Sequence, residues 1–169
     1  MELKSPEQLL AEMDEQLTAY LTERNINNPA MVGIHTGGVW VASALHQMQG
    51  INDPLGILDI SFYRDDFSRI GMSPEVKPST LPFSVDDRHI ILVDDVLFTG
   101  RTIRAALNEL FDYGRPASVT LAAMAVRSGR EIPISADIVG CQLNLDSTQQ
   151  IKLKGPEPLS ISIVEVTDR

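Results

Sequence analysis

The sequence predicts an α/β fold in which a mostly parallel central sheet carries helices on both faces. Short apolar runs of the kind that form buried strands alternate along the chain with segments of helical periodicity. Polar clusters follow several of these runs directly, as expected at the carboxyl ends of parallel strands. The chain has 169 residues, 43% of them hydrophobic, which is enough to bury a core. We therefore expect one domain spanning residues 1–169.

The first half of the chain predicts two helices and two strands. Ser5-Pro6-Glu7-Gln8 has the pattern of a capping box that opens a helix. The run "AMVGI" (30–34) predicts a short buried strand, and an apolar helix is expected near residues 39–48. A second strand is expected at "LGILDISF" (55–62). The first helix presents one apolar face, which consists of Leu9, Leu10, Met13, Leu17, Tyr20 and Leu21.

The second half continues the alternation. "HIILV" (89–93) is the clearest buried strand of the chain. The helix after it ends at Gly114 and Pro116, which are typical helix terminators. Further strands are expected at 118–126, 136–140 and 159–166. The apolar positions of the helix are Ile103, Leu107, Leu110 and Phe111.

Residues 63–88 break the pattern, because they contain three prolines and show little periodicity. A stretch of this length inside a compact domain is usually a lid, a binding arm or a disordered loop. The sequence alone leaves these three possibilities open for residues 63–88.

Composition restricts the class of protein. The net charge of −9 argues against a broad nucleic-acid surface. Cys141 is the one cysteine, so an intramolecular disulfide is impossible and a reducing, cytoplasmic setting is favoured. The N-terminus is acidic and amphipathic, unlike a signal peptide, and no apolar run approaches the length of a membrane span. We expect no membrane partner.

The strongest candidate site follows the strand at 89–93. Thr99-Gly100-Arg101-Thr102 stands where a loop turns into a helix, so backbone N–H groups and two hydroxyls are available to an anion. Asp94 and Asp95 come just before this loop. Ionised carboxylates accept hydrogen bonds, and the vicinal hydroxyls of a ribose donate them. A sugar phosphate satisfies both features, and the acids would also offset positive charge at a ribosyl carbon or hold Mg²⁺ through water.

These residues resemble a known family. "ILVDDVLFTGRT" (91–102) is similar to the phosphoribosyl-diphosphate (PRPP) signature of type I phosphoribosyltransferases. "LDISFYRDD", "FDYGRPASV" and "REIPISADIVG" resemble segments of the PyrR subgroup, which are pyrimidine operon regulators and uracil phosphoribosyltransferases. The resemblance covers most of the chain and implies the type I phosphoribosyltransferase fold. It also implies that uracil and PRPP give UMP and diphosphate, with Mg²⁺ required.

The resemblance assigns a role to each polar cluster. Asp94 and Asp95 would meet the ribose and act in catalysis together with Arg64. The 5′-phosphate would lie in the loop formed by Val96, Leu97, Phe98, Thr99, Gly100, Arg101 and Thr102. The diphosphate loop would consist of His35, Thr36, Gly37 and Gly38. Residues 63–88 would contain a flexible arm, or hood, over the carboxyl edge of the sheet, with Tyr63, Asp65, Asp66 and Lys77 in it. The base or regulatory region would contain Val126, Arg127 and Arg130.

The sequence departs from the subgroup at three places. Gly37 stands where an arginine is usual in the diphosphate loop, and Val126 stands where an aspartate is usual near the base and metal. The first helix lacks the basic residues of RNA-binding members. Instead its polar residues include Glu7, Glu12, Asp14, Glu15 and Gln16, which would repel a phosphate backbone.

The departures leave alternatives open. One is a weakly active or inactive regulator of pyrimidine biosynthesis that senses UMP, UTP or PRPP and acts through RNA or a protein partner. Another is a phosphoribosyltransferase for a different base. The resemblance also implies a homodimer or homotetramer.

Overall fold

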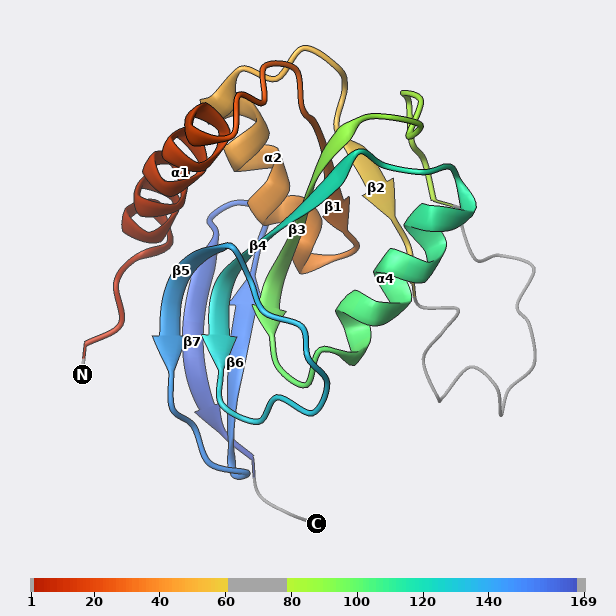
Figure 1. The fold of residues 1–169 in the computed structure, drawn as a ribbon. Helices are drawn as coiled ribbons and strands as arrows, with labels where there is room; N and C mark the ends of the chain where they lie inside the picture. The colour runs from red at the N-terminus through yellow and green to blue at the C-terminus, as the bar shows by residue number, and fades with distance from the viewer. Residues whose placement is uncertain (1, 61–78, 167–169) are drawn as a thin grey trace.

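The computed structural model describes residues 2–60 and 79–166. Helices and strands alternate in the N-terminal part as the sequence predicts, whereas the last four elements are all strands (Figure 1). Among the described residues, no helix is long and apolar enough to cross a membrane. The elements in chain order are α1 (Pro6–Glu23), β1 (Ala30–Ile34), α2 (Gly37–Gln49), β2 (Gly56–Leu58), β3 (His89–Leu97), α4 (Arg101–Asp112), β4 (Ser118–Arg127), β5 (Ile138–Leu143), β6 (Gln149–Lys154) and β7 (Ser160–Glu165).

The main sheet has five strands in the order β2-β1-β3-β4-β5, and each adjacent pair is parallel. All five strands therefore end at the same edge, where α2 and α4 begin (Figure 1). This confirms the predicted α/β class with a mostly parallel sheet. It also brings the polar clusters that follow β1, β3 and β4 to one edge of the molecule.

The sheet is buried on both faces. Along β3, Ile91 and Val93 face a core that they share with α1 and α2, whereas Ile90 and Leu92 face a second core shared with α4. Because neighbouring side chains of a strand point to opposite faces, a continuous apolar run is what a doubly covered strand requires. The run at 89–93 predicted this correctly.

The first helix begins as the sequence indicates. The Ser5 hydroxyl accepts a hydrogen bond from the backbone N–H of Gln8 (3.2 Å), and the Gln8 side-chain oxygen accepts one from the N–H of Ser5 (3.0 Å). This reciprocal capping box satisfies two N–H groups that the helix leaves without a backbone partner.

Several details differ from the prediction. β3 continues to Leu97, because Asp94, Val96 and Leu97 stay in register with β4. Helix α2 begins at Gly37 instead of near residue 39, so two residues of the predicted diphosphate loop form its first turn. Phe111, predicted to be on the apolar face of its helix, is exposed.

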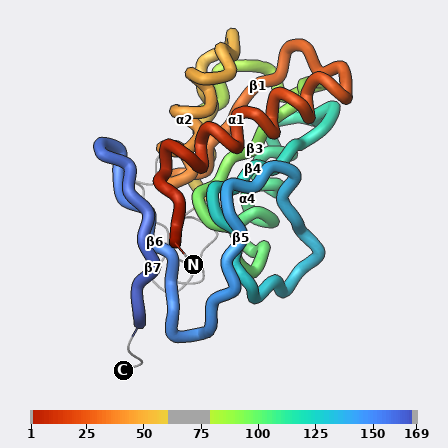
Figure 2. The backbone as a smooth tube through the Cα atoms, turned by 90° about the vertical axis from the view of Figure 1, so that its left-hand side faces the viewer, coloured from red at the N-terminus to blue at the C-terminus, as the bar shows by residue number. Residues whose placement is uncertain are grey.

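The C-terminal segment forms a separate hairpin. The strand expected at 159–166 is β7, and it pairs antiparallel with β6, which the sequence analysis did not predict. Leu153, Leu159 and Ile161 pack against the core shared by α1 and α2. The hairpin therefore lies on the α2 side of the main sheet (Figure 2).

The predicted arm begins after β2 and falls mostly outside the described residues. Tyr63, Arg64, Asp65, Asp66 and Lys77 all lie there, so their assignments stay predictions.

The described residues on either side of this stretch are paired. Ile57 and Thr80 exchange two backbone hydrogen bonds of 2.8 Å each. The Ser79 hydroxyl accepts a bond from the N–H of Asp59 (3.0 Å) and donates one to Glu109 Oε1 of α4 (2.6 Å). Both ends of the stretch are thus tied to the folded domain.

The Glu109 carboxyl at this junction lies in surroundings that disfavour its charged form. Burial raises the pKa of its carboxyl above the ordinary 4.5, the nearby charges of Asp59 and Asp112 raise it further, and the Ser79 hydrogen bond opposes them. Its Oε2 is buried without a hydrogen-bond partner among the described residues. Relative to the unfolded chain, the folded state therefore favours the protonated form of this carboxyl.

A raised pKa means that the folded protein binds more protons than the unfolded chain between pH 4.5 and the shifted value. The free energy of unfolding must fall as the pH rises through that window. We predict that Glu109→Gln, which is neutral and keeps the Oε1 acceptor, gains stability over the parent as the pH rises.

Urea denaturation of both proteins at about pH 4 and about pH 7.5 measures this effect. Glu157→Gln, an exposed acid of the hairpin turn, is the matched control and should show no such trend. An equal stability difference for Glu109→Gln at both pH values would contradict the account.

Candidate functional site

The candidate site lies where the sheet changes its winding direction. From β1 the chain passes through α2 to the outer strand β2, and from β3 it passes through α4 to β4 on the other side. Ligands of open α/β sheets bind beside such a switch point, outside the carboxyl ends of the strands. Two predicted clusters meet here: the diphosphate loop after β1, and the paired acids with the phosphate loop at the end of β3.

The two clusters are in direct contact because two glycines permit it. A Cβ atom on Gly37 would stand 2.2 Å from Oδ2 of Asp95. One on Gly38 would stand 2.7 Å from the carbonyl oxygen of Val93 and 3.2 Å from Oδ1 of Asp94. A Cβ atom on Gly37 would therefore have to displace the Asp95 side chain, and one on Gly38 would have to displace the backbone of β3. The first turn of α2 therefore rests on the paired acids.

The acids are held by the backbone of their own strand. Asp94 is only 4% exposed, and its Oδ1 accepts the N–H of Asp95 at 2.8 Å. Oδ1 of Asp95 accepts the N–H of Val96 at 2.8 Å, and Asp95 is half-buried. With one oxygen fixed in this way, the Asp95 carboxylate has a defined orientation beside Gly37.

Two helices begin at the site, and neither has a side-chain cap. The N-cap residues are Thr36 for α2 and Gly100 for α4. Their first N–H groups lack helical partners, and the positive end of each helix dipole points the same way. By contrast α1, which packs on the same face of the sheet as α2, carries a complete capping box. Two uncapped helix starts beside each other suit a ligand with two anionic groups.

The phosphate loop leads into α4 through a glycine. Neither Thr99 nor Thr102 caps α4, because the N-cap residue is Gly100, with φ at +97°. The Thr99 hydroxyl accepts the N–H of Arg101 at 3.2 Å, and Thr102 is exposed. At the diphosphate loop, His35 and Thr36 are exposed and joined by a cis peptide bond.

The segment after β4 is hydrogen-bonded to the phosphate loop. The backbone N–H groups of Glu131 and Ile132 both donate to the carbonyl oxygen of Thr99, at 3.0 and 3.2 Å. A Cβ atom on Gly100 would stand 2.7 Å from Ile132. The predicted base or regulatory region is therefore adjacent to the predicted phosphate loop, as a nucleotide site requires.

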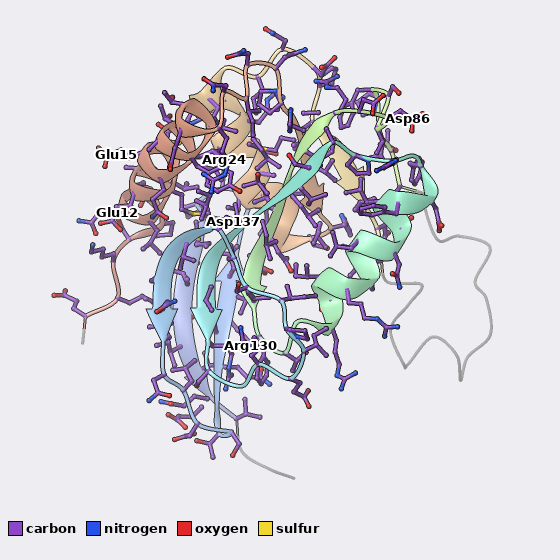
Figure 3. The ribbon with its side chains drawn as sticks, viewed as in Figure 1. Glu12, Glu15, Arg24, Asp86, Arg130 and Asp137 are labelled. Atoms are coloured by element: carbon purple, nitrogen blue, oxygen red, sulfur yellow. The ribbon has the colours of Figure 1, made fainter. Side chains whose placement is uncertain are left out.

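The three residues named for that region have different surroundings. Val126 is half-buried and pairs with Leu97 of β3 and Gln142 of β5. Arg130 is exposed on the loop after β4 (Figure 3). Arg127 is 7% exposed, and its side chain is occupied by contacts within the protein. Glu131 pairs with Arg101 at 3.5 Å.

Sequence reasoning missed the contacts that hold the phosphate loop. Phe98 lies under the guanidinium of Arg127, which is 4.0 Å from the ring centroid. An aromatic residue between paired acids and a Thr-Gly turn gives no sign of its partner, because that partner is about thirty residues further along the chain. Only the parallel pairing of β3 with β4 brings the two together.

A magnesium ion fits this site only together with its substrate. Among the described residues, no group of three or more His, Cys, Asp and Glu side chains could hold a metal. Two neighbouring carboxylates, those of Asp94 and Asp95, remain. Mg²⁺ typically keeps several waters and binds through one or two carboxylates together with substrate phosphates, so this donor set is suitable for it.

The fold and these loops define a class of protein. The sequence matches the family described as "Phosphoribosyl transferase domain" over residues 2–159. The fold is similar to that of a hypoxanthine-guanine phosphoribosyltransferase from Bacillus anthracis, with a TM-score of 0.67, 17% identity and coverage of 85% of this chain and 84% of that one. A purine phosphoribosyltransferase from Pyrococcus horikoshii gives a TM-score of 0.60 at 22% identity, covering 80% and 84%. The chain belongs to the phosphoribosyltransferase family.

Curated relatives narrow the assignment. "Bifunctional protein PyrR" of Nitrosococcus oceani is 65% identical over 149 residues, which are 87% of this chain and 84% of that protein. The protein of the same name from Pseudomonas paraeruginosa is 57% identical over 161 residues, 95% of each chain. Within the family this chain is of the PyrR type.

We predict that Gly37→Ala weakens PRPP binding more than it weakens the fold. The new methyl group must push Asp95 or the start of α2 aside, and a displacement of about 1 Å at a binding centre costs on the order of tenfold to a hundredfold. Isothermal titration with PRPP and Mg²⁺ measures the loss.

The matched control is Ser43→Ala, a substitution on the exposed side of the same helix. It should leave PRPP affinity within about twofold, because surface changes seldom exceed ~0.5 kcal/mol. Unchanged PRPP affinity in Gly37→Ala would show that contact with Asp95 does not shape the site.

Proposed function

We propose that this protein is a uracil phosphoribosyltransferase that converts uracil and PRPP into UMP and diphosphate. The observation that carries the proposal is the meeting of two uncapped helix starts with two oriented carboxylates. PRPP carries a phosphate at one end of its ribose, a diphosphate at the other and two hydroxyls between them. The site offers an anion-binding group at each end and hydrogen-bond acceptors between them.

In the proposed complex the 5′-phosphate lies in the loop at residues 98–102, at the start of α4. The diphosphate lies beside residues 35–38, at the start of α2. Asp94 and Asp95 stand between the two helix starts and accept hydrogen bonds from the ribose hydroxyls. This order follows the order of chemical groups along PRPP.

The reaction itself needs little covalent help from the protein. A ring nitrogen of uracil forms the new bond to the ribosyl carbon as the bond to diphosphate breaks, and the nitrogen loses its proton. Positive charge develops on the ribosyl carbon on the way, as in glycoside transfer. The paired carboxylates stabilise this charge, while the helix starts orient the reactants. Mg²⁺, held through water by Asp94 and Asp95, would neutralise diphosphate charge.

Two departures from the subgroup pattern, at Gly37 and Val126, change what the proposed site offers its substrates. At position 37 the glycine removes a fixed positive charge but lets the diphosphate loop rest directly on Asp95. We propose that Arg64 and Lys77 supply charge to the diphosphate. Val126 offers no polar side chain to the base, so base recognition falls to the backbone and side chains of the segment after it, including Arg130.

The PyrR-type assignment adds a role in pyrimidine gene regulation. We propose UMP and UTP as further ligands of the same site, a cytoplasmic location and a homodimer or homotetramer. The outer surface of α1 carries acidic residues, among them Glu15, while Glu12 forms an ion pair with Lys4 (Figure 3). This face disfavours RNA.

We predict that Asp94→Asn combined with Asp95→Asn lowers the rate of UMP formation by about 10²-fold or more, since both the ribose acceptors and the stabilising charge are weakened. Steady-state turnover of uracil with PRPP and Mg²⁺ measures it, and circular dichroism checks the fold.

Asp112→Asn, an exposed acid at the end of α4, is the matched control and should retain the parent rate. Turnover that persists in the double variant would show that the acids do not have this role. Absence of uracil turnover in the parent, with UMP binding retained, would instead overturn the enzymatic proposal.

For RNA, we predict no specific binding to the 5′ leader of a pyrimidine message. Filter binding at several salt concentrations measures affinity, and a leader of shuffled sequence is the control. A clear preference for the natural leader, weakening steeply with salt as phosphate contacts require, would contradict the prediction.

A further inference from the structure

Arg127 ends β4 with a charged group that is almost completely buried. Its donors point to backbone carbonyl oxygens: Nη1 to Gln149 at 2.7 Å, Nη2 to Asp146 at 3.2 Å and Nε to Ser128 at 3.3 Å. Three backbone carbonyls thus accept hydrogen bonds from the guanidinium, and no carboxylate among the described residues forms an ion pair with it. The side chain therefore fastens the end of β4 to the connection between β5 and β6.

The same guanidinium lies over the ring of Phe98, 4.0 Å from its centroid. Phe98 is the residue at which β3 gives way to the phosphate loop. Stacking of a guanidinium on an aromatic face is favourable, and burial of the cation strengthens it. Phe98 is 44% exposed, so no apolar core holds the ring, and Arg127 is a principal contact.

A second feature fixes the same ring. Gly129 has φ at +118°, and a Cβ atom there would stand 2.4 Å from the ring of Phe98. Glycine adopts this conformation at low cost and leaves the space that the ring occupies. Arg127 and Gly129, two residues apart, together form the seat of Phe98.

The connection between β5 and β6, whose carbonyl oxygens accept hydrogen bonds from Arg127, contains further hydrogen bonds. The Ser128 hydroxyl donates to the carbonyl of Leu145 at 2.9 Å and accepts its N–H at 3.0 Å. Hydrogen bonds from Thr148 hold the pKa of Asp146 below its usual value, with the charge of Arg127 a smaller cause. The residues between β5 and β6 are thus joined to Ser128 and to one another by hydrogen bonds.

We propose that Arg127 is a positioning residue: it holds the phosphate loop in its binding conformation by joining Phe98 to the connection between β5 and β6, without touching the ligand. The C-terminal hairpin thereby acts on the site through one side chain. This inference rests on the proposed function, because it assigns the 5′-phosphate to that loop. It differs from the direct contact with base or RNA implied by the resemblance.

The first test compares Arg127→Met, Arg127→Lys and Phe98→Leu with Arg115→Met, an exposed arginine outside the site. We expect Arg127→Met to raise the Kd for PRPP about tenfold, with kcat and the KM for uracil within about twofold, as for a supporting contact that orients a binding loop. Phe98→Leu, at a partly exposed position, should fold normally and show the same change. Arg115→Met should match the parent.

Lysine should not restore affinity, because an ammonium group cannot stack on the ring and bridge two carbonyls in the same way. Rescue by Arg127→Lys would mean that charge alone matters and would overturn the proposal. A change confined to the KM for uracil, or to kcat, would overturn it too, since either would place Arg127 at the base or at the reacting atoms.

A double-mutant cycle tests the link itself. If Arg127 acts through Phe98, the Kd for PRPP of Arg127→Met combined with Phe98→Leu should equal that of either single variant. Fully additive effects would show that the two residues act independently.

Hydrogen exchange of the parent and of Phe98→Leu, without any ligand, separates this inference from the proposed function. The amides at 98–102 should exchange faster in the variant, whether or not the protein binds PRPP. Unchanged exchange there would overturn the positioning role. Failure of the parent to bind PRPP would overturn the proposed function while leaving the exchange result interpretable.

Discussion

The site depends on one close approach, that of the first turn of α2 to the end of β3. Gly37 and Gly38 make it possible, since a side chain at either position would occupy the space of Asp95, Asp94 or the strand backbone. Close packing leaves a protein interior little room to absorb such a change. The contact fixes the start of α2 against the paired acids at the end of β3.

The second half of the site is supported differently. The loop that follows β3 relies on the segment after β4, through two hydrogen bonds to Thr99 and the seat of Phe98. That segment in turn is held by the connection leading to the hairpin. One loop is thus fixed by steric contact with the paired acids, and the other by a chain of polar and aromatic contacts that reaches the C-terminal hairpin.

Local patterns predicted the parts of the fold that local physics determines. The capping box at Ser5, the doubly buried strand at 89–93 and the placement of polar clusters at strand ends all follow from nearest neighbours in sequence. β6 was missed because its alternation of half-buried and exposed residues is short and polar, and only pairing with β7 reveals it. Likewise, the sequence around Phe98 gives no sign of Arg127, and in sequence Gly37 indicates only a missing charge, because its contact with Asp95 depends on the fold. Such features arise from long-range packing.

The most direct measurement of the central claim is a crystal structure of the protein with PRPP and Mg²⁺. The account predicts the 5′-phosphate at residues 98–102, the ribose hydroxyls at Asp94 and Asp95, and the diphosphate beside Gly37 and Gly38. PRPP bound in the opposite direction, or with its ribose away from both acids, would contradict it.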